Sequence, residues 1–242
     1  MEKAKTVLIT GGNKGIGFET ARRLGKMGFV ILLGARDEKR GQEAVIQLVN
    51  EEINAHFIPL DVTVQETIHS AAVHIDEQYG SLDVLINNAG VSLDRGNPPS
   101  QLELSQFKRT YDVNVFGMFS VTKAFLPLIK QAPAGRIVNL SSGLASLTLN
   151  SDPKSEFYGL NLLAYMSSKT AVNALTVLLA KELRETTIKV NSADPGFTST
   201  DLNGHRGYRS VEQAATIIVE LSTLANDGPS GGFFDENGVV SW

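Results

Sequence analysis

Short apolar runs alternate with longer amphipathic stretches along most of the chain. The short runs are uninterrupted and rich in β-branched residues or leucine, which is typical of strands buried on both faces of a parallel sheet. They predict strands at 6–10, 30–34, 56–60, 84–87, 136–141 and 189–193, and a weaker seventh strand at 232–234.

The stretches between these runs carry the periodicity of helices. They predict helices at 16–27, 38–50, 64–79, 105–130, 160–184 and 211–224. Thr63 is positioned to cap the third helix with Glu66 completing a capping box, and Gly28 and Gly80 stand where helices should end. The alternation predicts a single domain over residues 1–242. Its fold class is α/β and doubly wound, a mostly parallel seven-stranded sheet with helices on both faces.

Composition narrows the function classes. The chain has a net charge of -4, which gives no reason to expect nucleic acid or an anionic membrane as a partner. It contains no cysteine, so disulfides, thiolate catalysis and cysteine-ligated metals are excluded. The histidines form no ligand pattern, and no metal is expected. We expect a cytoplasmic protein, because we see neither a signal peptide nor an apolar stretch of the ~20 residues that a membrane span needs.

A glycine-rich turn follows the first predicted strand. Gly11, Gly15 and Gly17 lie between this strand and the first helix. Glycine lets the backbone turn sharply and approach a pyrophosphate, and a helix N-terminus offers unpaired N–H groups to an anion. The spacing GxxxGxG is neither the common GxGxxG fingerprint nor a Walker motif. Its place on the first strand favours a Rossmann-type dinucleotide site, although a simple tight turn is the alternative.

Two cationic residues lie where dinucleotide-binding folds contact the ribose of the adenosine. Arg36 follows the second predicted strand, and Lys14 lies inside the glycine turn. Both are suited to a 2′-phosphate, whereas no carboxylate ends the strand to accept a bare 2′-hydroxyl. Asp37 follows Arg36 directly, and its carboxylate would instead favour a bare 2′-hydroxyl. The pattern favours a phosphorylated dinucleotide, and the alternative is two solvated surface cations.

Tyr165 and Lys169 stand four positions apart in a predicted helix and therefore share one face. A neighbouring ammonium favours the phenolate, so we expect Lys169 to lower the pKa of Tyr165 towards the neutral range in which a general acid or base works. Taken alone, the pair is weak evidence, because most such pairs are surface neighbours on a helix.

Other polar residues stand near the predicted strand ends, where ligands bind in open α/β sheets. Ser141 and Ser142 end the fifth strand, where a hydroxyl can hold a substrate carbonyl or simply cap a helix. Asn114 lies inside a predicted helix, although asparagine is a poor helix former, and it could bend the helix or hold a water. Predicted loops also follow strands, at 91–101, 144–159 and 194–209.

Together these features resemble the short-chain dehydrogenase/reductase family along the whole chain. The matching segments are TGGNKGIG (10–17), LDV (60–62), NNAG (87–90) and PGFTST (195–200). The resemblance implies four catalytic residues: Ser142 holds a carbonyl, Tyr165 transfers a proton, Lys169 holds the nicotinamide ribose, and Asn114 fixes a water. It implies cofactor contacts from Gly11, Asn13, Lys14, Gly15, Ile16, Gly17, Arg36, Asp61, Val62, Asn88, Ala89, Gly90, Tyr165, Lys169, Pro195, Gly196, Thr198 and Thr200.

A closer resemblance is to the carbonyl-reductase-like branch, which favours NADPH. It implies an NADPH-dependent reductase of a small ketone or aldehyde, or in reverse a dehydrogenase of a secondary alcohol. The alternatives are a nucleotide-sugar epimerase or dehydratase and a non-catalytic NAD(P) sensor. The gap between Ser142 and Tyr165 is longer than the family's usual gap. The extra segment, 147–159, could cover the helix face used for dimerisation, which favours a monomer over a homodimer, or it could lie over the active site.

Overall fold

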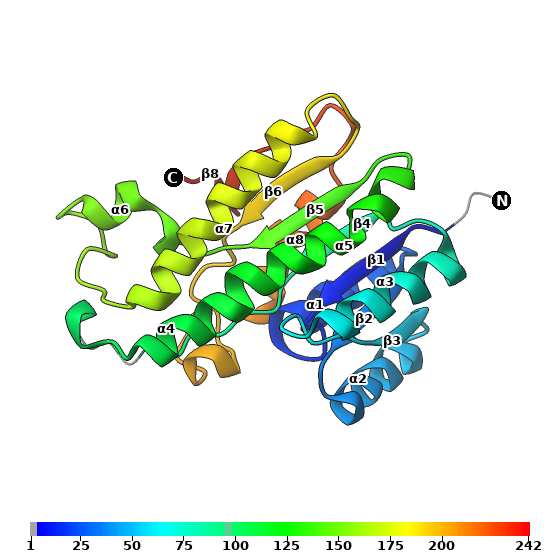
Figure 1. Ribbon diagram of the computed structural model, residues 1–242, viewed down its shortest axis with the longest axis horizontal. Coiled ribbons are helices and arrows are strands. Elements are labelled where there is room, and N and C mark those ends of the chain that lie inside the picture. Colours follow the sequence, from blue (N-terminus) through cyan, green and yellow to red (C-terminus); the bar gives the residue numbers. More distant parts are fainter. Residues whose placement is uncertain (1–3, 95, 97) are drawn as a thin grey trace.

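An eight-stranded sheet forms the centre of the protein (Figure 1). The computed structural model describes residues 4–94, 96 and 98–242, so residues 95 and 97 of the predicted loop 91–101 lie outside the described residues. The strands are β1 (Thr6–Thr10), β2 (Val30–Ala35), β3 (Ala55–Pro59), β4 (Val84–Asn87), β5 (Arg136–Leu140), β6 (Lys189–Ala193), β7 (Phe233–Asp235) and β8 (Gly238–Val239). They lie in the order β3-β2-β1-β4-β5-β6-β7-β8, and only the β7–β8 pair is antiparallel.

The predicted doubly wound, mostly parallel sheet is confirmed. The strands β1, β2, β4 and β5 are buried along their whole length, which explains their unbroken apolar sequences. The number of strands differs from the prediction, because β8 is an additional strand. It folds back on β7, with Val239 opposite Phe234, and its two residues are too few to carry an alternating pattern.

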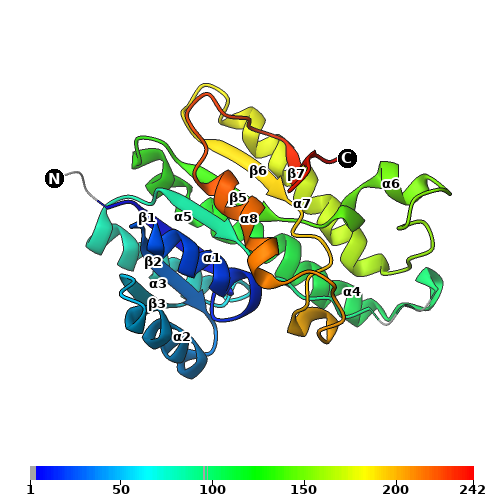
Figure 2. The same ribbon diagram turned by 180° about the vertical axis from the view of Figure 1, so that it is seen from behind.

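Two layers of helices enclose the sheet. The helices are α1 (Gly15–Lys26), α2 (Glu38–Asn50), α3 (Gln65–Tyr79), α4 (Leu104–Tyr111), α5 (Met118–Gln131), α6 (Leu147–Ser151), α7 (Leu163–Glu182) and α8 (Val211–Ser222). Helices α3, α5 and α7 cover one face of the sheet (Figure 1), and α1, α2 and α8 cover the other (Figure 2). Successive strand residues enter opposite cores, since Leu8 packs in the first layer and Val7 and Ile9 pack in the second.

The predicted helix 105–130 is interrupted. A π-helical segment, η2 (Asp112–Gly117), joins α4 to α5 and contains Asn114. Such π-helical turns are rare in proteins, and many of those that do occur lie at functional sites. The expectation that Asn114 disturbs its helix is therefore correct.

Two local predictions are wrong. Helix α3 begins at Gln65, and Thr63 does not cap it, because its hydroxyl donates to the Asp61 carboxylate at 2.7 Å. The predicted loop 144–159 contains a short helix, α6, whose N-terminus is capped by Ser146. In both places a short polar side chain uses a nearby backbone or side-chain partner that the sequence pattern does not reveal.

One helical stretch, Leu104–Gln131, is long and apolar enough to cross a membrane by length and composition alone, with a mean hydropathy of 1.2. The expectation that no stretch meets this criterion is therefore wrong. Half of its most apolar window is buried inside the protein, and the stretch contacts α3, α7 and β4. A core helix meets the same criterion, so the absence of a membrane partner stays a prediction.

A chain of buried polar side chains crosses the sheet beneath α5 and α7. The Asn87 amide donates to Thr122 Oγ1 at 2.9 Å and to Asn139 Oδ1 at 2.8 Å. Asn139 in turn donates to Thr176 Oγ1 at 2.8 Å, and the Ser192 hydroxyl reaches the same oxygen at 2.9 Å. The chain links β4, β5 and β6 to both helices, so it fixes how these elements pack.

Replacing the central member of this polar chain tests its contribution. Asn139→Ala removes the hydrogen bond from the Asn87 amide and the hydrogen bond to Thr176 Oγ1. The Asn87 amide still donates to Thr122, and Thr176 still binds Val172 O and Ser192, so the variant loses two hydrogen bonds of about 1 kcal/mol each. We expect the free energy of unfolding, measured by urea denaturation, to fall by about 2 kcal/mol. Ser222→Ala is the control, because this buried hydroxyl bonds only the backbone of its own helix, at Ile218 O. Equal losses in the two variants would contradict the prediction.

Candidate active site

The catalytic pair of the sequence analysis lies on α7, beside the carboxyl ends of β4 and β5. Lys169 is buried, with an exposed fraction of 5%, and its Nζ donates to Leu140 O at the end of β5 at 2.7 Å. The same Nζ lies 5.8 Å from the centre of the Tyr165 ring. The structure therefore brings Tyr165 and Lys169 together, as their spacing predicts.

The side chains of the two serines that end the fifth strand lie on opposite sides of the backbone. The Ser142 side chain lies near the Tyr165 phenol and acts to lower its pKa. Ser141 turns to the opposite side, where its hydroxyl donates to Lys169 O at 3.4 Å. Ser142 is therefore the serine that can share a substrate oxygen with Tyr165.

The protonation of this pair differs from the expectation. Burial raises the pKa of Tyr165 to about 12, the negative charge of Asp194 adds to the rise, and the Ser142 side chain opposes it. Burial also lowers the pKa of Lys169 to about 8. In the protein alone the pKa of Tyr165 is thus raised by burial and by Asp194 rather than brought towards neutrality by Lys169. Tyr165 is held as the neutral phenol, the form that donates a proton.

Asn114 and Gly90 lie next to this pair. A Cβ atom on Gly90 would lie 3.5 Å from Asn114 Oδ1 and 3.6 Å from Lys169 Nζ, so Gly90 borders both of these buried polar groups. The Asn114 amide donates to Val91 O at 2.9 Å and to Ser168 Oγ at 3.0 Å. Both of its N–H groups are used, and its predicted role in holding a water stays a prediction.

The glycine turn has the geometry of an anion cradle. Gly11 and Gly15 have positive φ angles of 61° and 58°, which side chains rarely tolerate. A Cβ on Gly17 would lie 2.5 Å from the Asn88 amide nitrogen, which itself donates to Thr10 O and Gly11 O. A backbone turn of this kind at the start of α1 fits the pyrophosphate of a dinucleotide. Asn13 and Ile16 complete the turn around these glycines.

The loop after β6 lies beside this cradle. A Cβ on Gly15 would be 3.6 Å from Thr200 Cγ2, which joins the segment 195–200 to the phosphate turn. Gly196 has a φ of 70°, and the buried Thr198 hydroxyl donates to Pro195 O at 3.1 Å. The predicted cofactor residues of this loop therefore share one region with those of the turn.

The loop after β6 is anchored at two further points. Lys14 Nζ lies 2.5 Å from Asp201 Oδ2, so an ion pair crosses from the phosphate turn to η4 (Asp201–Asn203). Arg209 forms a two-pronged ion pair with Glu236 of the turn between β7 and β8, at 2.6 Å for one prong. The β7–β8 hairpin thus holds the loop after β6 through this ion pair.

The remaining predicted cofactor residues lie at the ends of β2 and β3. Arg36 is exposed directly after β2. Asp37, the possible ribose ligand, caps α2 instead, since its Oδ1 accepts from Arg40 N at 3.0 Å. Asp61 follows β3, and its Oδ1 accepts two hydrogen bonds from Thr63, while Val62 is buried beside it.

The sequence pattern of the short chain dehydrogenase family matches residues 5–209, which is most of the chain. This chain belongs to the short-chain dehydrogenase family. It is 37% identical to a short-chain dehydrogenase of Penicillium roqueforti, anuI, over 98% of this chain and 96% of that protein. It is 34% identical to carbonyl reductase 1 of Rattus norvegicus, a protein named for NADPH, over 97% of both chains.

A solved structure agrees with this assignment. The NADPH-bound carbonyl reductase from chicken fatty liver covers 100% of both chains with a TM-score of 0.86 and 28% identity. The resemblance stated from the sequence, including the carbonyl-reductase-like relatives, is confirmed. This short-chain dehydrogenase is an oxidoreductase that acts on carbonyl or alcohol groups.

One charged group near Tyr165 of this short-chain dehydrogenase was missed by the sequence analysis. Asp194 directly follows β6, and burial raises the pKa of its carboxyl group. Its Oδ1 accepts from Gly196 N at 2.9 Å, and the backbone N–H of Gly143 also binds the carboxylate. It therefore joins the loop beside Ser142 to the loop after β6. The sequence feature that could have identified Asp194 is its position at the end of a predicted strand, where ligands bind in such sheets.

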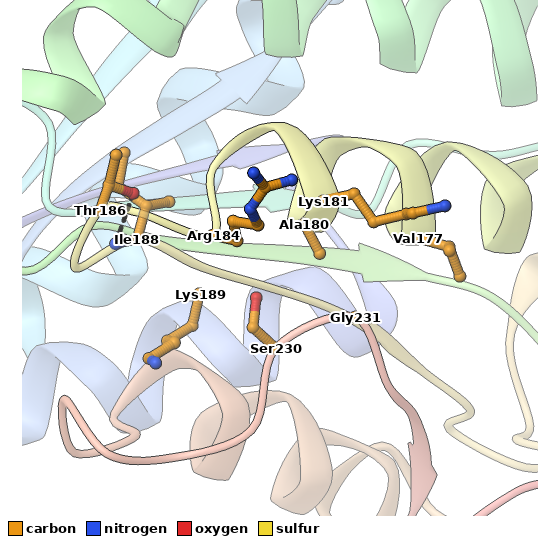
Figure 3. A pocket seen from close by; sticks show the side chains of 9 residues that line it. All are labelled: Val177, Ala180, Lys181, Arg184, Thr186, Ile188, Lys189, Ser230 and Gly231. Atoms are coloured by element: carbon orange, nitrogen blue, oxygen red, sulfur yellow. Dashed lines mark hydrogen bonds between the residues drawn. The ribbon is translucent and has the colours of Figure 1, made fainter.

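A surface hollow of about 340 Å³ lies elsewhere on this short-chain dehydrogenase. Its lining comes from the C-terminal part of α7, the start of β6 and the chain just before β7 (Figure 3). The side chains of Lys181, Arg184 and Lys189 line it but do not converge on one point (Figure 3). It lies at the opposite end of α7 from Tyr165, so it is separate from the catalytic groups.

The buried ammonium of Lys169 leads to a prediction about stability. Because burial lowers its pKa to about 8 from the ordinary 10.5, the unfolded chain binds this proton more tightly than the folded chain does. The charge therefore costs stability in full below about pH 8, and the cost disappears as the pH rises towards the unfolded value. We expect Lys169→Met to exceed the wild type in free energy of unfolding by about 1–2 kcal/mol at neutral pH, less than the shift alone implies because Leu140 O loses its donor.

Urea denaturation of both proteins between about pH 7 and pH 9.5 measures this difference. Groups that titrate alike in the two proteins cancel, so the difference isolates Lys169. We expect the excess stability of the variant to shrink as the pH rises from about 8. An excess that stays constant over the range would contradict the lowered pKa.

Proposed function

We propose that this short-chain dehydrogenase is an NADPH-dependent carbonyl reductase that reduces a small ketone or aldehyde, or in reverse oxidises a secondary alcohol. The observation that carries the proposal is that Ser142, Tyr165 and Lys169 lie together at the carboxyl end of β5, with Lys169 Nζ 5.8 Å from the centre of the Tyr165 ring. A phenol next to a hydroxyl can supply a proton to a carbonyl oxygen that both groups contact. The names of the rat and chicken relatives, both carbonyl reductases, support the same reaction.

The residues of the chain would divide the work as follows. Ser142 holds and polarises the substrate carbonyl, and Tyr165 gives its proton to the carbonyl oxygen. Lys169, fixed to Leu140 O, stands behind Tyr165 and binds the ribose of the cofactor. Asn114 holds a water that returns a proton towards Lys169. NADPH, when bound, supplies the hydride.

The choice of NADPH over NADH is supported by the cations near the phosphate turn. Arg36 is exposed at the end of β2, and Lys14 stands in the turn itself. Asp37, the residue that would favour NADH, is already used as the cap of α2. Lys14 shares its charge with Asp201, so Arg36 is the residue on which we expect the preference to depend most.

The segment 147–159 is better suited to the active site than to an interface. Thr148 N donates to Trp242 O, and a Cβ on Gly143 would lie 3.1 Å from the ring of Phe157. These contacts put the segment next to Ser142. They support the alternative in which it lies over the cleft. The monomer expected from the sequence depended on this segment covering the dimerisation face, so it loses that support. The monomer and the cytoplasmic location stay predictions.

Replacing the proposed acid tests the reaction. Tyr165→Phe keeps the ring and removes the transferable proton, so we expect kcat for NADPH-dependent reduction of a carbonyl panel to fall at least ~100-fold. Binding of NADPH, followed by fluorescence titration, should be largely retained. Tyr111→Phe is the control, because this half-buried tyrosine stacks on Phe107 away from the pair. A Tyr165→Phe variant with near-normal turnover would refute the assignment.

Replacing the proposed phosphate ligand tests the cofactor. Arg36→Asp puts a carboxylate where a 2′-phosphate would lie, so we expect kcat/KM with NADPH to fall roughly tenfold or more relative to NADH. Lys39→Asp makes the same charge change on the exposed surface of α2 and should leave the ratio near its wild-type value. A wild type that prefers NADH would show that the proposed cofactor is wrong.

A further inference from the structure

The helix that carries the catalytic pair has no capping residue of its own. Helix α7 begins at Leu163, and Leu162 at its N-cap position makes no side-chain hydrogen bond to it. The first N–H groups of any helix have no partner inside the helix and need acceptors from elsewhere. Two of these N–H groups belong to Ala164 and Tyr165, close to the reacting phenol.

A carboxylate from a distant part of the chain supplies the missing cap. Asp94, in the loop after β4, accepts a hydrogen bond from Ala164 N at 2.8 Å and another from Tyr165 N at 3.1 Å. Each carboxylate oxygen takes one N–H group, and Asp94 is half-buried. A negative charge at this end also interacts favourably with the helix dipole.

The same loop is fastened to α7 a second time. Val91 exchanges two hydrogen bonds with the Asn114 amide, at 2.8 Å and 2.9 Å, and Asn114 donates to Ser168 Oγ at 3.0 Å. The loop thus meets the helix at Ser168 through Asn114, and at Tyr165 through Asp94. These two points enclose one turn of α7, the turn that separates the catalytic tyrosine from the catalytic lysine.

We propose that Asp94 is a positioning residue that holds the first turn of α7, and with it Tyr165, in register with Ser142. The inference rests on the proposed role of Tyr165 as the proton donor. Because Asp94 binds the backbone N–H of Tyr165 itself, loss of the cap lets the reacting residue shift. A misplacement of roughly 1 Å at a reacting group can reduce a rate by about 100-fold. Asp94 is not expected to touch the substrate or the cofactor.

Two variants of Asp94 and one control test the proposal. Asp94→Ala removes both acceptors, and Asp94→Asn keeps one acceptor oxygen. Asp83→Ala removes a comparable loop carboxylate at the opposite end of the sheet, which accepts from Thr6 N at 2.8 Å. With NADPH and whichever of benzaldehyde or cyclohexanone the wild type reduces, we expect Asp94→Ala to lower kcat about tenfold and to change KM by less than about twofold. Asp94→Asn should recover part of the loss.

Stability and hydrogen exchange separate positioning from a merely structural role. We expect Asp83→Ala to lower Tm at least as much as Asp94→Ala does but to leave kcat within about twofold. The amides of Ala164 and Tyr165 should exchange at least tenfold faster in Asp94→Ala than in the wild type. Unchanged exchange, unchanged kcat, or an equal loss of kcat in Asp83→Ala would each overturn the inference.

The outcomes also distinguish this inference from the proposed function. If the wild type is active, Tyr165→Phe is inactive and Asp94→Ala is normal, only the positioning role fails. If Tyr165→Phe stays active, or if the wild type reduces no carbonyl compound, the proposed function fails and the positioning role fails with it.

Discussion

The burial of one ammonium group is the constraint around which the functional end of the protein is arranged. The buried Nζ of Lys169 donates to Leu140 O, which fixes the N-terminal half of α7 to the end of β5 and offsets part of the cost of burying the charge. Gly90 has no side chain to fill the space beside it, and the ring of Tyr165 lies along its other side. A group that costs folding free energy is thus kept beside Tyr165 and Gly90, and a strongly shifted pKa of this kind is expected more often at functional sites.

One short segment after β4 joins the two halves of the site. Asn88 binds the backbone of the phosphate turn, Gly90 borders Lys169, and Asp94 caps the catalytic helix. The proposed cofactor residues and the proposed catalytic residues are therefore connected by only a few consecutive residues. The Asn87 side chain, at the start of this segment, extends the connection into the core through Asn139.

The sequence was informative where a structural rule has a fixed period or spacing. Buried parallel strands are apolar throughout, so the runs predicted the central strands, and the four-residue spacing predicted that Tyr165 and Lys169 share a face. Contacts between distant residues carry no such signal. The cap of α7 by Asp94 spans 70 positions, and the rise in the pKa of Tyr165 depends on burial and on Asp194. The two residues of β8 are too few for any periodic pattern.

The hairpin that ends the sheet has a consequence for behaviour at high protein concentration. A long, flat edge strand leaves free N–H and C=O groups to which another chain can add, and this is a common route to aggregation. Here β8 turns back on β7 after two residues, so only a very short row of groups is left at that edge. At the opposite edge, Pro59 ends β3 and has no N–H group to offer. The β8 edge of the sheet is therefore a poor template for strand addition, and the β3 edge offers one donor fewer than its length would allow.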